Sequence, residues 1–179
     1  MGPHPNDQSE VTKLLSGLER LNVAPEDEVQ EQLLACCGSR RWAEEMVARR
    51  PFSAFENLDT TARAIWWALA REDWMEAFRS HPEIGRKQPE TPTSAWSEQE
   101  QSGLLNADRE VKQALHELNA IYRERFGYIF IICATGKSSE EMLAILRQRL
   151  DNDPVTELRI AAEEQAKITT LRLHKLLNR

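Results

Sequence analysis

Glycine and proline are scarce in this sequence. Of 179 residues only 7 are glycine and 8 are proline, whereas Ala, Leu, Glu, Arg and Gln are plentiful. Glycine and proline interrupt helices and the plentiful residues favour them, so the intrinsic preference of the chain is helical. Apolar residues make up 41% and charged residues 29%, which is ordinary for a soluble globular protein. We therefore expect a helical protein, long enough for one domain with a substantial core.

Long apolar runs, an excess of basic residues and an even set of cysteines are missing as well. No apolar run approaches the ~20 residues that a membrane-spanning helix needs. The formal net charge of −6 argues against the clustered basic face that binds nucleic acid. Three cysteines favour reduced thiols over a disulfide framework. With a polar start, "MGPHPNDQSE", that resembles neither a signal nor a transit peptide, these features predict a cytoplasmic protein without membrane or nucleic-acid partners.

Apolar periodicity and helix-ending residues predict an all-α fold, a single-domain bundle of about eight helices. Pro25 with the acids behind it is typical of a helix start, and Gly38 and Gly127 are typical of helix ends. Residues 1–10 are expected to form a flexible N-terminal arm and residues 11–179 the helical domain. The helices are expected over residues 11–21, 25–37, 40–50, about 59–81 in one or two pieces, 97–105, 107–126, 138–150 and 155–177.

The segment "YIFIICA", residues 128–134, is the one stretch with the composition of a β-strand. A lone strand would have no partner in a helical protein. We therefore expect this segment to be a buried extended stretch or the start of a helix.

Several familiar motifs are absent or incomplete. "CATGKSS" resembles the end of a phosphate-binding P-loop, but Ile131 stands where that motif needs its first glycine. Cys36 and Cys37 are adjacent and so cannot form a C-x-x-C pair; with Cys133 they fit better as small buried residues. The four histidines show no metal-binding spacing, so no metal site is expected.

Several polar residues keep more than one interpretation. His81 ends a helical segment and precedes Pro82, so it fits a helix-end residue, a core residue or a proton carrier. Ser97 and Glu100 form an S-x-x-E capping box, but a helix N-terminus also suits a polar ligand. Arg172 by itself is better explained as a surface residue, although an arginine facing a pocket would offer a planar fork of donors to a carboxylate.

Taken together and in order, the segments "CCGSRRW", "RPF", "AFRSHPEIG", "WSEQEQSGL", "LNAIYRERFGYIFIICATGKSSEEML" and "LRLHKLL" are similar to one family. The chain resembles 2-oxo-4-hydroxy-4-carboxy-5-ureidoimidazoline (OHCU) decarboxylase from about Val11 to Asn178. The forms "CCGS" and "HPEIG" are typical of bacterial members. The resemblance implies an all-helical enzyme, commonly a homodimer, that uses no cofactor and converts OHCU to (S)-allantoin in the last step of urate oxidation.

The resemblance also implies site residues, carried over position by position. The catalytic histidine of the family matches His81, and Glu100 matches its acidic partner. The implied substrate-binding residues are Pro82, Ser97, Glu98, Gln99, Glu100, Gln101, Phe130, Ile131, Ile132, Cys133, Ala134 and Arg172. In this interpretation the amides of residues 130–134 serve as fixed donors to the substrate.

Two other classes of function compete with this one. A helical interaction module could have kept the fold without the chemistry, but such a relative would be expected to have lost His81, Glu100 or Arg172, and all three are present. A helical DNA-binding regulator is disfavoured by the acidic charge balance.

Overall fold

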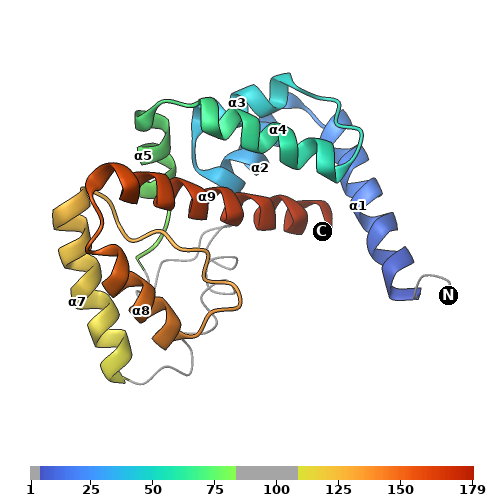
Figure 1. The fold of residues 1–179 in the computed structure, drawn as a ribbon. Coiled ribbons are helices and arrows are strands. Elements are labelled where there is room, and N and C mark those ends of the chain that lie inside the picture. The colour runs from blue at the N-terminus through green and yellow to red at the C-terminus, as the bar shows by residue number, and fades with distance from the viewer. Residues whose placement is uncertain (1–4, 84–108) are drawn as a thin grey trace. The chain divides into compact units, whose positions relative to one another are not determined.

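The computed structural model describes residues 5–83 and 109–179, and all regular structure within these ranges is α-helical (Figure 1). The all-α class is therefore confirmed. The eight helices of the described residues are α1 (Pro5–Val23), α2 (Glu26–Cys37), α3 (Arg40–Ala48), α4 (Phe55–Ala68), α5 (Arg71–Arg79), α7 (Arg109–Phe126), α8 (Ser139–Arg149) and α9 (Pro154–Leu177). None of these helices is long and apolar enough to cross a bilayer.

The chain divides into two compact units, each described here by itself. The first unit comprises residues 1–73 and 168–179, and the second comprises residues 74–167. Helix α9 therefore contributes its first part to the second unit and its last part to the first.

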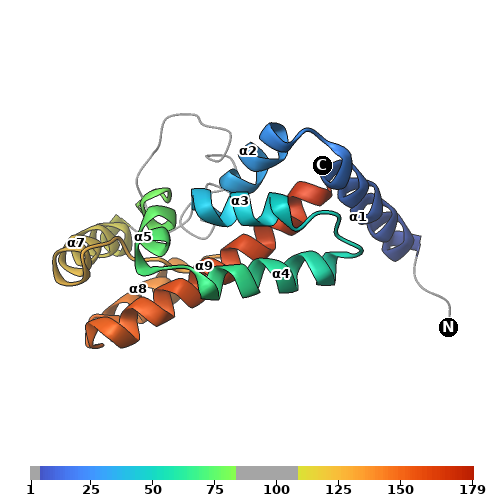
Figure 2. The ribbon, with the colours of Figure 1, turned by 90° about the horizontal axis from the view of Figure 1, so that it is seen from above.

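The first unit is built around α2, α3 and α4. Helix α3 packs against both α2 and α4, as Figure 2 shows. Gly38 ends α2 in the left-handed conformation, with φ 86°, and the Ser39 side chain accepts a hydrogen bond from the amide of Trp42 to cap α3. The indole of Trp42 is fully buried and donates to the carbonyl of Ala62, which joins α3 to α4 through a satisfied polar atom.

Helix boundaries in this unit differ from the expectation at two places. Helix α1 begins at Pro5, within the segment expected as an arm, and α4 begins at Phe55 rather than near Asp59. Residues 59–81 were expected in one helix or two, and the structure has two, since α4 ends at Ala68 and α5 begins at Arg71. Leu69 is extended at the end of α4, and Asp73 accepts a hydrogen bond from the amide of Ala70 just before α5. The helix expected from Ser97 lies outside the described residues.

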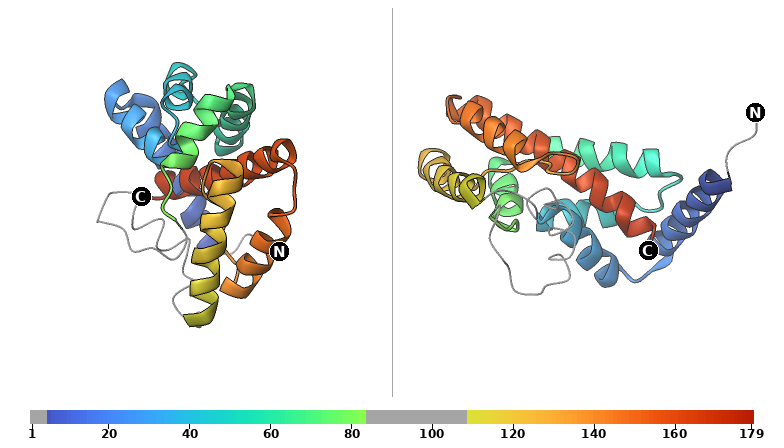
Figure 3. Two further views of the ribbon diagram at one scale, coloured as in Figure 1. Left: turned by 90° about the vertical axis from the view of Figure 1, so that its left-hand side faces the viewer. Right: turned by 90° about the horizontal axis from the view of Figure 1, so that it is seen from below.

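The second unit contains α7 and α8, which lie side by side in Figures 1 and 3. Gly127 ends α7 with φ 83°, as the sequence predicts. Helix α8 begins with a complete capping box, in which Ser138 accepts from the amide of Glu141 and the Glu141 carboxylate accepts from the amide of Ser138.

Between α7 and α8, residues 128–134 run without regular secondary structure. All of them except Ile129 are buried, so of the two alternatives, a buried extended stretch or the start of a helix, the structure excludes the helix start and confirms the burial. Its aromatic rings lie in a cluster around Tyr122: the ring centroids of Tyr128 and Phe130 are 5.8 and 5.5 Å from that of Tyr122. This cluster holds the segment against α7.

Candidate functional site

His81 lies just past the end of α5, in the turn that closes the helix. Its amide donates to the carbonyl of Phe78 at 3.2 Å, and the amide of Ser80 donates to the carbonyl of Ala77 at 3.1 Å. Phe78 is fully buried, and its ring centroid lies 5.1 Å from that of Tyr128. The backbone that carries His81 is therefore fixed to the aromatic cluster of the second unit, while Pro82 directly behind it ends the turn.

The imidazole of His81 is bonded to α9. Its Nε2 atom lies 2.6 Å from Oε1 of Gln165, a residue 84 positions later in the chain. Gln165 is 0% exposed, whereas His81 is only half-buried. Polar side chains that are buried this completely are almost always hydrogen-bonded, and His81 is one of the partners of Gln165.

Beyond Pro82, a second contact fixes the chain to α7. The guanidinium of Arg123 donates to the carboxylate of Glu83 at 2.7 Å. Arg123 is largely exposed, so this ion pair adds little to stability. It nevertheless links the residues after His81 to the same helix that supports the extended segment.

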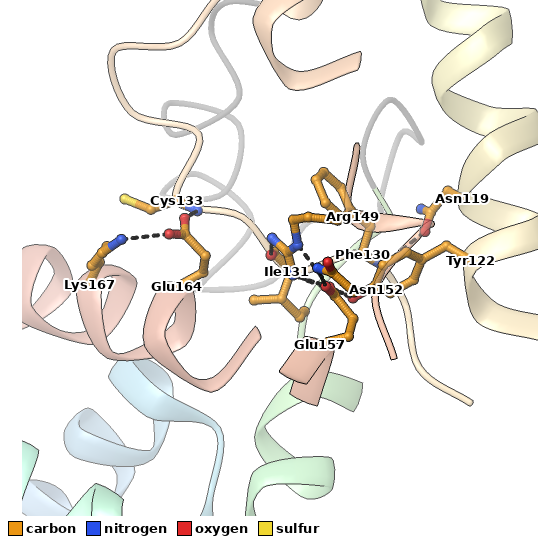
Figure 4. A network of polar contacts seen from close by, with 10 residues as sticks. All are labelled: Asn119, Tyr122, Phe130, Ile131, Cys133, Arg149, Asn152, Glu157, Glu164 and Lys167. Atoms are coloured by element: carbon orange, nitrogen blue, oxygen red, sulfur yellow. Dashed lines mark hydrogen bonds and ion pairs between the residues drawn. The ribbon is translucent and has the colours of Figure 1, made fainter. Parts of the chain in front are cut away.

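Two of the five backbone amides in residues 130–134 are already used within the protein. The amide of Phe130 donates to Oδ1 of Asn119 at 2.9 Å, and the amide of Cys133 donates to Oε2 of Glu164 at 2.7 Å (Figure 4). The amides of Ile131, Ile132 and Ala134 make no hydrogen bond within the described part of the chain. Of the five amides expected to donate to a substrate, only these three are not already bonded to another of the residues that the structure describes.

A buried ion pair between Arg149 and Glu157 supports residues 130–134. Nε of Arg149 donates to Oε1 of Glu157 at 2.7 Å, and the two side chains are 6% and 0% exposed. The Tyr122 hydroxyl also donates to Oε1 of Glu157, and Nδ2 of Asn152 donates to Oε2 at 2.7 Å. Arg149 further donates to the carbonyl of Ile131 at 2.8 Å, so the ion pair holds the extended segment directly (Figure 4).

Burial and hydrogen bonding shift the pKa values of two side chains near the extended segment, Tyr122 and Lys167. Burial raises the pKa of Tyr122 well above its usual value, and the hydrogen bond to Glu157 adds to the rise. Tyr122 is therefore a neutral donor at physiological pH. The hydrogen bond to Glu164 raises the pKa of Lys167, which keeps this cation beside the carboxylate that fixes Cys133.

The structure brings His81 and residues 130–134 into the same unit and anchors both to α9. Adjacent residues do this: Glu164 binds the amide of Cys133 and Gln165 binds the imidazole of His81. Ser97, Glu98, Gln99, Glu100 and Gln101 lie outside the described residues. Arg172 belongs to the first unit and is only 3% exposed, which corrects the interpretation of it as a surface residue.

Gln165 and Glu164 were not predicted from the sequence as site residues. A signal for Gln165 does exist: it lies at helical spacing from Ala161, Ala162 and Ile168, which are all buried. A glutamine within an apolar stripe indicates a buried polar contact. Among residues 12–83 and 109–179, no three His, Cys, Asp or Glu side chains are grouped as metal ligands would be. Cys36, Cys37 and Cys133 are all buried thiols, as the sequence suggests.

Comparison with known proteins gives consistent matches. A family model described as OHCU decarboxylase matches residues 22–174. The mouse (Mus musculus) 2-oxo-4-hydroxy-4-carboxy-5-ureidoimidazoline decarboxylase is 38% identical over 133 residues, which cover 73% of this chain and 75% of that protein. The corresponding protein of the archaeon Haloferax volcanii is 30% identical over 131 residues, covering 73% of this chain and 77% of that one.

The Arabidopsis thaliana uric acid degradation bifunctional protein TTL is 38% identical over 154 residues, which cover 83% of this chain but only 47% of that longer protein. Among solved structures, a crystal structure of OHCU decarboxylase in the presence of (S)-allantoin superposes with a TM-score of 0.74 at 39% identity. It covers 87% of this chain and 100% of that one. A structure of (S)-allantoin synthase, at 20% identity and a TM-score of 0.67, shares the fold.

Proposed function

This chain belongs to the OHCU decarboxylase family, and we propose that it converts OHCU to (S)-allantoin without a cofactor, as the last step of urate oxidation. The observation that carries the proposal is the anchoring of His81 and the extended segment to α9 by two adjacent residues. An imidazole and a row of amide donors, both held rigidly, are suited to a proton transfer on a polar substrate.

The chemistry of the substrate supports a reaction that needs no external electron sink. OHCU carries its carboxylate on a ring carbon that also bears a hydroxyl, next to the carbon of a ring C=N bond. When the bond to CO₂ breaks, its electron pair forms a C=C bond to that neighbour, and the C=N pair moves to nitrogen, which takes a proton. The resulting enol then loses its hydroxyl proton and gains a proton on carbon, which gives allantoin and sets its configuration.

In this scheme the protein supplies orientation, charge and one controlled proton. His81 accepts the hydroxyl proton or delivers a proton to one face of the enol, since a histidine with a reference pKa of ~6.5 can do either near neutral pH. The amides of Ile131, Ile132 and Ala134 donate to substrate oxygens. The resemblance assigns Glu100 to polarising the hydroxyl or orienting His81.

The remaining assignments follow the resemblance. Ser97 and Gln101, with Glu98 and Gln99 between them, would hydrogen-bond the ring and the ureido group. Pro82 would line the pocket beside His81, and Arg172 would pair with a substrate oxygen through its planar fork of donors. A homodimer in the cytoplasm and a bacterial type remain predictions. The relatives described above come from an animal, an archaeon and a plant.

His81→Ala tests the central assignment. Loss of an essential acid or base costs ~10²–10⁴-fold in rate. OHCU is generated freshly from urate by the two preceding enzymes, and formation of (S)-allantoin is followed by circular dichroism. His116→Ala is the matched control, because His116 is exposed on α7 and should leave the rate unchanged.

Two results would argue against the proposal. Turnover of His81→Ala at the parental rate would remove His81 from the mechanism. A parent protein that gave no chiral signal above the spontaneous background would leave the chain as a helical binding module.

A further inference from the structure

We infer that Gln165 is a positioning residue for His81: it holds the ring with its proton on Nε2 and directs Nδ1 toward the substrate. The inference rests on the proposed catalytic role of His81. It starts from the 2.6 Å contact between Nε2 of His81 and Oε1 of Gln165.

The chemistry of the two atoms fixes the tautomer. A glutamine Oε1 atom only accepts hydrogen bonds, so Nε2 of His81 must carry the proton that is shared. In the neutral ring the lone pair then lies on Nδ1, and Nδ1 is the atom that takes up or returns a proton. The opposite tautomer would place a lone pair against the lone pairs of Oε1.

The geometry around the contact suits a positioning role. Gln165 lies in the middle of α9 and is 0% exposed, so its side chain cannot swing into solvent. The backbone of His81 is held by its hydrogen bond to Phe78 and by Pro82. With the backbone fixed at one end of the side chain and Nε2 at the other, rotation of the imidazole about its side-chain torsions is restricted.

The neutrality of the amide also matters. A carboxylate at this position would favour the imidazolium form, because an opposite charge stabilises the protonated ring. An amide oxygen accepts the same hydrogen bond with a much weaker preference for the charged form. Gln165 therefore orients His81 and leaves it able both to take up a proton and to give one back, as decarboxylation followed by protonation requires.

Glu164, the residue before Gln165, also binds a part of the candidate site. Glu164 fixes the amide of Cys133, and Gln165 fixes His81, so one turn of α9 sets both the proton carrier and the backbone of the extended segment. A shift of this turn would move both together and keep their spacing. The contact that bears on the tautomer is the one between Gln165 and Nε2 of His81.

The first test is made on the parent protein and does not depend on activity. With ¹⁵N-labelled histidine, a long-range ¹H–¹⁵N spectrum above the histidine pKa distinguishes a protonated Nε2 from a protonated Nδ1. The His81 signal is assigned by its loss in His81→Ala. We expect His81 to be protonated on Nε2; a protonated Nδ1 in the parent would overturn the inference even if His81 proves catalytic.

The second test replaces Gln165 with methionine, which has a similar length and offers no comparable acceptor. In Gln165→Met we expect His81 to show both tautomers and the signal of His116 to stay unchanged. We expect kcat to fall by about tenfold or more while KM stays within about threefold, because orientation of the proton carrier affects the transition state more than binding.

Gln148→Met is the matched control, since it makes the same replacement at an exposed position of α8 and should change neither the spectrum nor kcat. If Gln165→Met kept the Nε2 tautomer and the parental kcat, Gln165 would have only a packing role. Thermal melts of both variants show whether the fold is retained. If Gln165→Met did not fold, the spectrum of the parent would still decide the inference.

Discussion

Replacing Glu157 with glutamine should destabilise the second unit strongly, because it removes one charge of a fully buried ion pair. Glu157 accepts on Oε1 from Arg149 and Tyr122, and on Oε2 from Asn152. A glutamine can keep its Oε1 against the first two donors. Its new amino group then faces Asn152, which can turn its own amide to present an oxygen. The hydrogen bonds survive, so the change isolates the charge.

The magnitude follows from burial. Arg149 is 6% exposed and would be left as an uncompensated cation, and breaking a buried pair in this way costs about 3–5 kcal/mol. Because the amide oxygen still accepts from Arg149, we expect the lower end, about 3 kcal/mol. For a urea dependence of about 1–3 kcal/mol per molar, the unfolding midpoint should fall by roughly 1–3 M.

Urea titrations followed by far-UV circular dichroism measure this loss. Glu45→Gln is the matched control. Glu45 pairs with Arg41 at the surface, where the two side chains are 37% and 64% exposed respectively, so this ion pair should contribute less than about 1 kcal/mol to stability. Adding Arg149→Met to Glu157→Gln removes the stranded cation. The double variant should therefore lose less than the sum of the two single changes. A loss for Glu157→Gln no larger than for Glu45→Gln would refute the reasoning.

Two further predictions concern stability. Since burial raises the pKa of Tyr122, the unfolded chain releases the phenol proton near pH 10 and the folded protein keeps it. The free energy of unfolding should thus fall as pH rises above about 10, by up to ~1.4 kcal/mol per pH unit. Urea titrations at rising pH should show a shallower fall for Tyr122→Phe, and equal slopes would contradict this. A Cβ on Gly17 would lie 2.0 Å from the carbonyl oxygen of Leu177. Gly17→Ala, which inside a helix ordinarily gains about 1 kcal/mol, should therefore lose about 1–3 kcal/mol and lower the thermal midpoint; a raised midpoint would contradict the close packing of α1 on the end of α9.

Features with a local cause could be predicted from the sequence. Gly38 ends α2 and Gly127 ends α7, and each of these ends is set by residues within one helical turn. Residues 128–134 were expected to form a buried extended stretch or the start of a helix because of their apolar composition, and they are largely buried and not helical. The start of α4 at Phe55 was missed, because Ala54 at its N-cap makes no side-chain hydrogen bond and so carries no capping signal.

The candidate site was predicted in part. His81 and residues 130–134 were named through the family resemblance, and the structure joins both to α9. Arg172 was better explained as a surface residue on sequence grounds and is buried. Gln165 and Glu164 were overlooked, since their partners His81 and Cys133 lie 84 and 31 positions away in the chain.

Helical hydrogen bonds, caps and apolar periodicity involve residues a few positions apart, so most of the helices could be predicted from the sequence. Which polar side chains become buried, and which partners they bond to, followed from the packing of the folded chain. Burial of Glu157, Gln165 and Arg149 results from packing between segments distant in sequence, and a buried polar atom must then bond to whatever donor or acceptor that packing brings near. The proton position on His81 is such a case: it depends on a glutamine that only the fold places beside it.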